Sequence, residues 1–466
     1  MLNAESKKLI VTPELTKALE EMISSGQLDA YLASKNSDRT APAFSTDDKG
    51  NIKQYNENCK LALEYDELLS GAIRFNEMTN QMDIVREMPW KRFTTAFTDN
   101  DQDNIIIYLE KNYGLKMDKQ IERAIRVVAK ENSYHPVKDK LNSLVWDGNE
   151  RLKHVLSKYL GVEDTPLAIE SLKVFMLGAI ERVFNPGCKF EYMLCLVGGQ
   201  GAGKSSFLRY LAMEDEWFTD DIKKLSDKDI FEQLSGHWIL EIPEMLAILK
   251  AKYVEETKSF ISRQSDNYRI KYEKYSADHP RQCVFAGTSN RTEFLPPDKS
   301  GNRRFLPIEV DMANAEVHIN SNPDETRRYF EQLWAEVMTI YQSGDYQLVL
   351  SPEMEQELKL HQKKFMPEDP LETAIVNYIE KEHPKYICTK LLAEEALDME
   401  NVTTLDRWLS NDIAEIINKA FANEYRKTSH YFEAYGKQKA WVLIQDLNEP
   451  EFKQLTLEEE KELPFK

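Results

Sequence analysis

The feature that most constrains this chain is an apolar run followed by a glycine-rich segment. Tyr192–Val197 has the length and composition of a buried strand, and the next eight residues, GGQGAGKS, fit the spacing GxxxxGK followed by Ser or Thr. Glycines let the backbone turn its N–H groups toward phosphate oxygens, and a helix beginning near Ser205 would direct the positive end of its dipole there. The segment therefore predicts a strand, a phosphate-binding loop and a helix.

The residues of this loop have expected roles in binding a magnesium nucleotide. The side chain of Lys204 is long enough to reach the β and γ oxygens, and the hydroxyl of Ser205 can ligate magnesium. The residues expected to contact the nucleotide are Gly198, Gly199, Gln200, Gly201, Ala202, Gly203, Lys204, Ser205 and Ser206.

Two further apolar runs predict the rest of a parallel sheet. They are residues 238–242 and 283–289, and an apolar helix over 168–183 precedes the first strand. Consecutive apolar runs separated by helices are typical of a parallel sheet that is covered on both faces. We therefore predict an α/β fold.

Polar side chains follow these strands, where ligands bind in an open α/β sheet. Glu241 and Glu244 follow the second strand and are expected to supply a metal-orienting acid and a water-activating base, although the spacing does not say which glutamate has which role. We take Ser205 and Glu241 as the metal ligands. Asn290 follows the third strand, where an amide can orient the attacking water.

Two arginines, Arg303 and Arg304, follow a glycine turn further along the chain. An arginine supplied across a subunit boundary can stabilise charge on a transferring phosphoryl group. The alternative is an ordinary surface pair held by local carboxylates.

The segment 258–281 is the candidate nucleic-acid site. Residues 250–309 contain twelve Lys or Arg and eight Asp or Glu, in a chain whose formal net charge is −19. Cations beside tyrosines, in an alternating pattern like that of a short hairpin, suit the phosphates and stacked bases of a single strand. A solvated charged hairpin with tyrosines packed beneath it fits the composition nearly as well. The candidate contacts are Arg269, Lys271, Tyr272 and Lys274.

The flanking regions predict additional domains. We expect an N-terminal helix and polar linker over 1–50, a helical domain over 51–160, the nucleotide-binding domain over 161–350, and an acidic tail over 448–466. Over 351–447 we expect a helical connector, followed by three helices and a hairpin that give the outline of a winged helix, which can bind DNA or protein. Its candidate contacts are Arg407, Trp408, Arg426, Lys427, Lys437 and Lys439.

The composition indicates a soluble cytoplasmic protein. No stretch approaches the roughly 20 apolar residues of a membrane span. The five cysteines are scattered without a CxxC pair, so they are expected to be buried thiols in a reducing compartment.

Taken together, the motifs resemble the virulence-associated protein E family, whose members are encoded by phages and mobile islands and are similar to superfamily 3 helicases of the AAA+ class. The motifs are WDG at 146–148, the loop at 198–205, EIPE at 241–244, GTSN at 287–290 and GNRRF at 301–305. The resemblance implies an AAA+-type core that binds ATP and Mg²⁺ between the subunits of a ring, commonly a hexamer, with DNA at its centre.

By the same resemblance, Arg303 or Arg304 would reach the neighbour's ATP, and Lys271 or Lys274 would contact DNA from a pore hairpin. The first hypothesis is thus a DNA-dependent ATPase and helicase of a phage or mobile element. The alternative is a factor that uses ATP as a switch to load or inhibit other replication proteins and does not unwind DNA. A small-molecule kinase would share the loop but would need neither the arginines nor the C-terminal domain.

Overall fold

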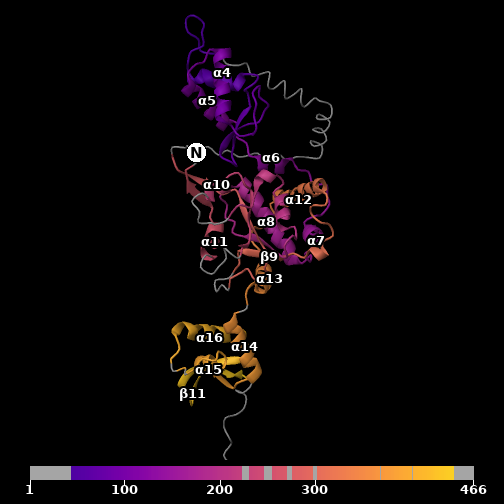
Figure 1. The fold of residues 1–466 in the computed structure, drawn as a ribbon, viewed down its shortest axis with the longest axis vertical. Coiled ribbons are helices and arrows are strands. Elements are labelled where there is room, and N and C mark those ends of the chain that lie inside the picture. Colours follow the sequence, from indigo (N-terminus) through magenta and orange to yellow (C-terminus); the bar gives the residue numbers. More distant parts are fainter. Residues whose placement is uncertain are drawn as a thin grey trace, which may run out of the picture.

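The computed structural model describes residues 43–222, 230–245, 254–269, 275–296, 302–367, 369–400, 402 and 404–444. They form three modules that follow one another along the longest axis of the molecule (Figure 1). The N-terminal helix and the acidic tail predicted from the sequence lie outside the described residues. Among the described helices, none is long and apolar enough to cross a membrane.

The central module contains a five-stranded sheet in which all neighbouring strands are parallel. The three predicted strands are confirmed, and each is entirely buried. The strand order is β4-β5-β8-β3-β9. The strands are β3 (Met193–Val197), β4 (Phe218–Thr219), β5 (Ile239–Ile242), β8 (Val284–Ser289) and β9 (Phe305–Glu309).

The side chains of β3 alternate between the two faces of the sheet. Leu194 and Leu196 join one hydrophobic cluster, whereas Met193, Cys195 and Val197 join another. The first cluster also contains residues of the helices α8 (Pro166–Phe184), α9 (Lys204–Leu211) and α12 (Pro323–Ser343), and the second contains residues of α10 (Ile230–Leu234) and α11 (Val254–Ile261). The sheet is thus covered on both faces, as the uninterrupted apolar runs predict.

Two edge strands were not predicted. β4 has only two residues, which is too few to give a pattern. β9 begins directly after Arg303 and Arg304, which the sequence analysis placed after a glycine turn. Pro307 lies within β9, and a proline is tolerated there because β9 pairs on one side only, with β3.

The N-terminal module is mostly helical and also contains a hairpin that the sequence analysis did not predict. Strands β1 (Ile73–Asn76) and β2 (Gln81–Ile84) form an antiparallel hairpin, each only four residues long. Its helices are α3 (Asn56–Tyr65), α4 (Asp99–Tyr113) and α5 (Asp118–Glu131), whereas α6 (Pro136–Ser143) and α7 (Val155–Leu160) pack in the core of the central module.

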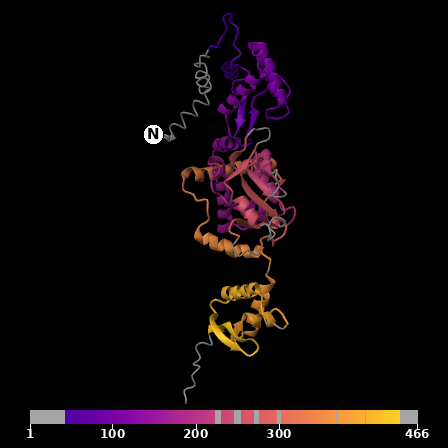
Figure 2. The same cartoon turned by 90° about the vertical axis from the view of Figure 1, so that its left-hand side faces the viewer.

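The C-terminal module follows α13 (Pro352–Gln362), as Figure 2 shows. The three predicted helices and the predicted hairpin are present, and β10 completes a small antiparallel sheet of order β10-β12-β11. The elements are α14 (Pro370–Glu382), β10 (Tyr386–Cys388), α15 (Thr389–Glu395), α16 (Arg407–Ala420), β11 (Tyr425–Phe432) and β12 (Gly436–Leu443).

Candidate active site

The loop between β3 and α9 requires glycine at three positions. Gly201 and Gly203 have φ angles of 78° and 73°, in the left-handed region that side chains with a Cβ rarely adopt. At Gly198 a Cβ would lie 2.4 Å from the carbonyl oxygen of Val310, so the backbones approach too closely for any other residue. The loop conformation therefore follows directly from the glycine spacing in the sequence.

Lys204 begins α9 and folds back over this loop. Its Nζ donates hydrogen bonds to the carbonyl oxygens of Gly198 and Gly199, both at 2.7 Å, and to Oδ1 of Asn290 at 3.0 Å. The residue is only 7% exposed. Burial lowers the pKa of Lys204, and the charges of Glu244 and Glu241 oppose that shift. A positive charge is thus held inside the loop by three oxygens.

Glu241, on β5, is the most buried carboxylate of the site, at 1% exposure. Its Oε1 accepts hydrogen bonds from the hydroxyls of Ser205 (2.8 Å) and Thr288 (2.6 Å). Its Oε2 is buried and has no hydrogen-bond partner within the described parts of the chain. Burial raises the pKa of Glu241 and outweighs the two hydroxyl hydrogen bonds, which act in the opposite direction.

These groups fit a magnesium ion. Mg²⁺ prefers oxygen ligands and is commonly held by one or two carboxylates together with substrate phosphates, so a complete protein cage is not required. In the described residues no three His, Cys, Asp or Glu side chains are grouped as a metal site. The unpartnered oxygen of Glu241 and the adjacent hydroxyl of Ser205 supply hard oxygen donors beside the loop.

Glu244 differs from Glu241 in both exposure and partners. It is exposed, its φ angle is 50°, and its Oε1 accepts a hydrogen bond from Nδ2 of Asn290 at 2.6 Å. Asn290 therefore contacts Glu244 with one side-chain atom and Lys204 with another. The structure thus places the two glutamates in different environments, a distinction that the spacing in the sequence could not make.

Thr288 is a residue that sequence reasoning missed. It lies on β8 two positions before Asn290 and is 6% exposed. Residues two apart in a strand point to the same face, so the polar pair at 288 and 290 at the end of an apolar run was the available signal. Its hydroxyl fixes Glu241 from the neighbouring strand.

The structure does not bring Arg303 and Arg304 to this loop. Both precede β9, next to the start of β3, where their guanidinium groups lie 3.3 and 3.5 Å from the carboxylate of Glu191. Because strands rise about 3.3 Å per residue, the length of β3 separates them from the loop by roughly 13 Å. They pair with a local carboxylate, which is the alternative considered in the sequence analysis, and they lie at the amino ends of the strands, whereas the loop lies at the carboxyl ends.

The predicted hairpin is partly described. β6 (Ser265–Tyr268) pairs antiparallel with β7 (Ala277–Pro280), and Arg269 is exposed at the end of β6. Lys271, Tyr272 and Lys274 lie outside the described residues. At the base of the hairpin, the guanidinium of Arg281 binds the carboxylate of Asp266 through two hydrogen bonds of 2.6 and 3.0 Å, and both groups are buried.

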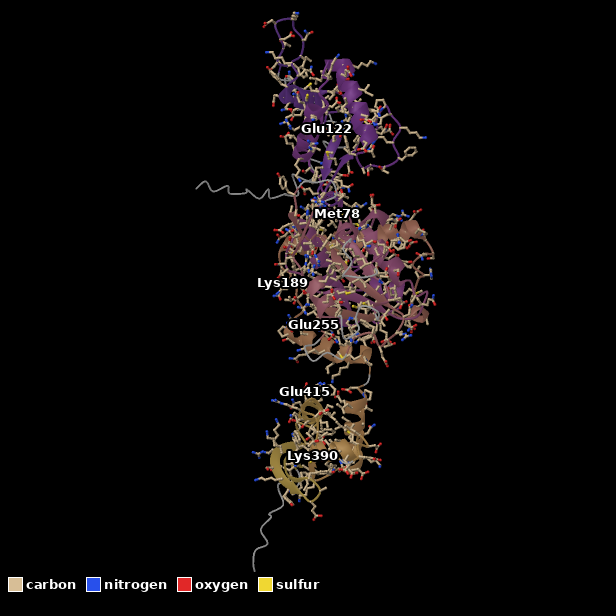
Figure 3. All side chains as sticks on the ribbon, turned by 60° about the vertical axis from the view of Figure 1, so that its left-hand side comes forward. Met78, Glu122, Lys189, Glu255, Lys390 and Glu415 are labelled. Carbon is tan, nitrogen blue, oxygen red and sulfur yellow. The ribbon has the colours of Figure 1, made fainter. Side chains whose placement is uncertain are left out.

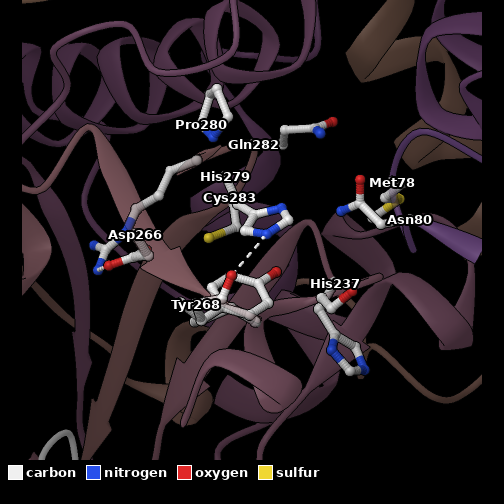
Figure 4. A pocket seen from close by; sticks show the side chains of 12 residues that line it. Met78, Asn80, His237, Asp266, Tyr268, His279, Pro280, Gln282 and Cys283 are labelled. Atoms are coloured by element: carbon white, nitrogen blue, oxygen red, sulfur yellow. Dashed lines mark hydrogen bonds and ion pairs between the residues drawn. The ribbon is translucent and has the colours of Figure 1, made fainter. Parts of the chain in front are cut away.

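A cavity of about 40 Å³ lies beside this hairpin base (Figure 4). The ring of Tyr268 stacks on Phe231 at 5.3 Å between centroids and contacts His279 at 4.0 Å. Met78 and Asn80, from the turn between β1 and β2, line the other side of the cavity. A space of this size has room for only a few water molecules and is far smaller than a usual small-molecule site.

A much larger cavity, about 720 Å³, adjoins the loop on the β9 side. This volume falls within the usual range for small-molecule sites. It is lined by Gly198 and Gly199 of the loop, by residues at and before the start of α8, by the end of β9, and by His361 and Lys364 at and just after the end of α13.

Comparisons with known proteins agree with part of this picture. The model of the virulence-associated protein E-like domain matches residues 141–367. No curated protein matches the chain. An A-form apo structure of the NrS-1 C-terminal region has a TM-score of 0.49 and 12% identity, and covers 84% of this chain and all of that one. Another A-form apo structure of that region has a TM-score of 0.47 and 15% identity, with 81% and 98% coverage. These values are too low to transfer a function.

Proposed function

We propose that the chain, whose residues 141–367 match the model of the virulence-associated protein E-like domain, is a cytoplasmic ATPase with an AAA+-type P-loop core that unwinds DNA in the replication of a phage or mobile element. The observation that carries the proposal is the convergence of three strand ends. Lys204 and Ser205 follow β3, Glu241 lies on β5, and Asn290 follows β8. Hydrogen bonds join Lys204 to Asn290 and Ser205 to Glu241.

The loop would bind the phosphates of ATP. Its N–H groups and the start of α9 favour an anion, and Lys204 would exchange the carbonyl oxygens of Gly198 and Gly199 for the β- and γ-phosphate oxygens. This exchange is favourable because a buried ammonium gains charged acceptors in place of neutral ones. The large cavity beside Gly198 would accommodate the nucleoside.

Glu241 and Ser205 would hold Mg²⁺, and Glu244 would act as the base. Mg²⁺, when bound, neutralises charge on the transferring phosphoryl group. Glu241 suits the metal because it is buried next to Ser205, whereas Glu244 is exposed and can reach a water molecule. Asn290 would orient Glu244 and the attacking water, and would report the state of the phosphate through Lys204.

Hydrolysis would require a second copy of the chain. Arg303 and Arg304 lie at the edge of the sheet opposite the loop, so neither can serve the nucleotide of its own subunit without rearrangement. Exposed Arg303 can instead reach a neighbour's ATP, in a ring that we propose to be a hexamer with DNA at its centre.

Arg269 and the predicted contacts Lys271, Tyr272 and Lys274 would face that DNA. The C-terminal module, with three helices and a three-stranded sheet, would be a winged helix.

The test is ATP hydrolysis with and without single-stranded DNA, with Lys204→Ala as the blank. We expect hydrolysis that DNA stimulates severalfold and that the variant abolishes. Hydrolysis that is indifferent to DNA would favour the alternative, an ATP-switched assembly factor for replication proteins. No hydrolysis above the Lys204→Ala blank under any condition would refute the ATPase itself.

The two functions also differ in what the hairpin must do. A helicase needs cations facing the DNA, so the charge reversals Lys271→Glu and Lys274→Glu should abolish unwinding and DNA stimulation while basal hydrolysis remains. Unwinding that survives both reversals would remove the hairpin from the mechanism.

A further inference from the structure

Helix α5 of the N-terminal module presents four cations on one face. Lys119, Arg123, Arg126 and Lys130 are all exposed and follow the spacing i, i+4, i+7 and i+11. At about 100° and 1.5 Å per residue, their side chains fall within an arc of about 60° and along about 16 Å of the helix. We call these four residues the α5 stripe.

The opposite face of α5 fixes the helix in the module. Five of its residues are buried in the core of the N-terminal module, against helices α3 and α4 and strand β1. They are Ile121, Ala124, Ile125, Val128 and Ala129. The α5 stripe is therefore carried by a helix that cannot rotate without opening the core, so the spacing of its charges is set.

Three cations of the stripe have no close carboxylate in the described parts of the chain. Four other lysines between residues 60 and 140 each lie within 4.0 Å of a carboxylate, whereas no described carboxylate lies that close to Lys119, Arg123 or Arg126. Lys130 lies over the ring of Phe75, 3.5 Å from its centroid. The paired lysines are Lys60, Lys116, Lys138 and Lys140.

The acidic residues of α5 lie outside the stripe. Asp118 and Glu122 fall to one side of the arc, and Glu131 falls on the other side, where it pairs with Lys60 at 2.9 Å. Glu122 is half-buried and accepts a hydrogen bond from Gln102. In a chain of net charge −19, this row of cations is a local positive surface that attracts a polyanion.

We propose that the α5 stripe binds the phosphate backbone of DNA, without regard to base sequence, as a site separate from the hairpin of the central module. The proposal rests on the proposed function only in taking DNA as the polyanion. Successive cations of the stripe are about 5 to 6 Å apart along the helix, which lets each one meet a different phosphate of a strand running beside it.

The position of α5 would let DNA that is bound at the hairpin extend to the α5 stripe. The chain leaves α5 at Glu131 and reaches His135, whose ring nitrogen is 2.6 Å from Oε1 of Gln282, two residues after β7. Nε2 of Gln282 also donates to the carbonyl of Glu77 at 3.0 Å. In Figure 3 Glu122 of α5 lies in the module beyond Met78, which lines the cavity at the hairpin base. DNA held by both sites would thus lie across the junction of the two modules.

The experiment measures binding of fluorescent single-stranded DNA by anisotropy between 50 and 200 mM salt, without nucleotide. The test variant carries Lys119→Gln, Arg123→Gln and Arg126→Gln, since glutamine keeps helix propensity and removes charge. Each lost phosphate contact lowers the salt dependence by about 0.7, so we expect the slope of log affinity against log salt to fall by about two. Affinity at 50 mM salt should fall on the order of tenfold, while hydrolysis without DNA stays unchanged.

The matched control removes three exposed lysines from other helices: Lys111→Gln, Lys359→Gln and Lys381→Gln. It should bind DNA with the wild-type slope. A slope equal for all three proteins would overturn the α5 proposal and leave the ATPase intact. Wild-type protein that hydrolyses no ATP and binds no DNA would refute both proposals. If the triple variant unfolds at a lower temperature, the double variant Lys119→Gln and Arg126→Gln should still lose about 1.4 from the slope, and a wild-type slope there would overturn the proposal.

Discussion

Replacing Glu241 with glutamine should make the empty protein more stable and the enzyme inactive. Burying a carboxylate costs several kcal/mol, and the two hydroxyls that donate to Oε1 return only about 1.5 to 3 kcal/mol each. Oε2 accepts no hydrogen bond from the described residues. Glutamine keeps the shape without the charge, although it also loses the attraction to Lys204. We estimate a net gain of about 1 kcal/mol, which is about 2 to 4 °C in melting temperature for a module of this size.

The direction of the pKa shift of Glu241 determines how the stability difference between the variant and the wild type depends on pH. Because burial raises the pKa of Glu241 above its ordinary 4.5, the folded chain binds this proton more tightly than the unfolded chain does. The contribution of Glu241 to wild-type stability is therefore fully present below pH 4.5 and is lost as pH rises through the folded pKa. Glu241→Gln lacks this dependence, so its advantage should be largest at neutral pH and should shrink toward pH 4.5.

Thermal unfolding at pH 7.5 and at pH 5, without magnesium or nucleotide, measures the effect. Glu244→Gln is the matched control, because Glu244 is exposed and its loss should change stability by no more than about 0.5 kcal/mol. Hydrolysis by Glu241→Gln should fall by about 100-fold or more, the size expected for losing one group that stabilises charge. A variant that is less stable than wild type at pH 7.5, or a difference that does not change with pH, would refute the reasoning.

Three further predictions test other parts of the structure. Gly198→Ala places a Cβ 2.4 Å from a backbone oxygen that cannot move freely, so it should cost about 1 to 3 kcal/mol in thermal unfolding and impair nucleotide binding. Asp266→Ala leaves the buried guanidinium of Arg281 uncompensated, and we expect a loss of about 3 to 5 kcal/mol together with weaker DNA binding through the hairpin. Arg303→Ala subunits mixed with Lys204→Ala subunits should recover some hydrolysis, because each defect would affect a different nucleotide site; no recovery at any ratio would contradict an arginine acting between subunits.

The central sheet and its loop could be predicted from the sequence because each signal there is local. An apolar run of strand length, three obligatory glycines and a following helix leave few alternatives for residues 192–211. β9 could not be found in this way, because Pro307 argues against a strand unless its edge position is already known. The hairpin of β1 and β2 was missed because four residues are too few to establish alternation.

The sequence motif does not determine which role each of Glu241 and Glu244 takes. The sequence separates the two carboxylates by Ile242 and Pro243, and from spacing alone either one could orient the metal. Strand geometry decides: Glu241 is still within β5, paired with β8, so it meets the hydroxyls of Ser205 and Thr288 in a buried layer. The chain then turns at Pro243 and holds Glu244 at a φ angle of 50°, which directs it outward to Asn290. Because that backbone conformation is uncommon for a residue with a side chain, the hydrogen bond from Asn290 helps to maintain it. Asn290 therefore holds the proposed base and binds Lys204 at the same time. A movement of Lys204 toward a phosphate would break its hydrogen bond with Asn290 and so change the hydrogen bonding of Glu244.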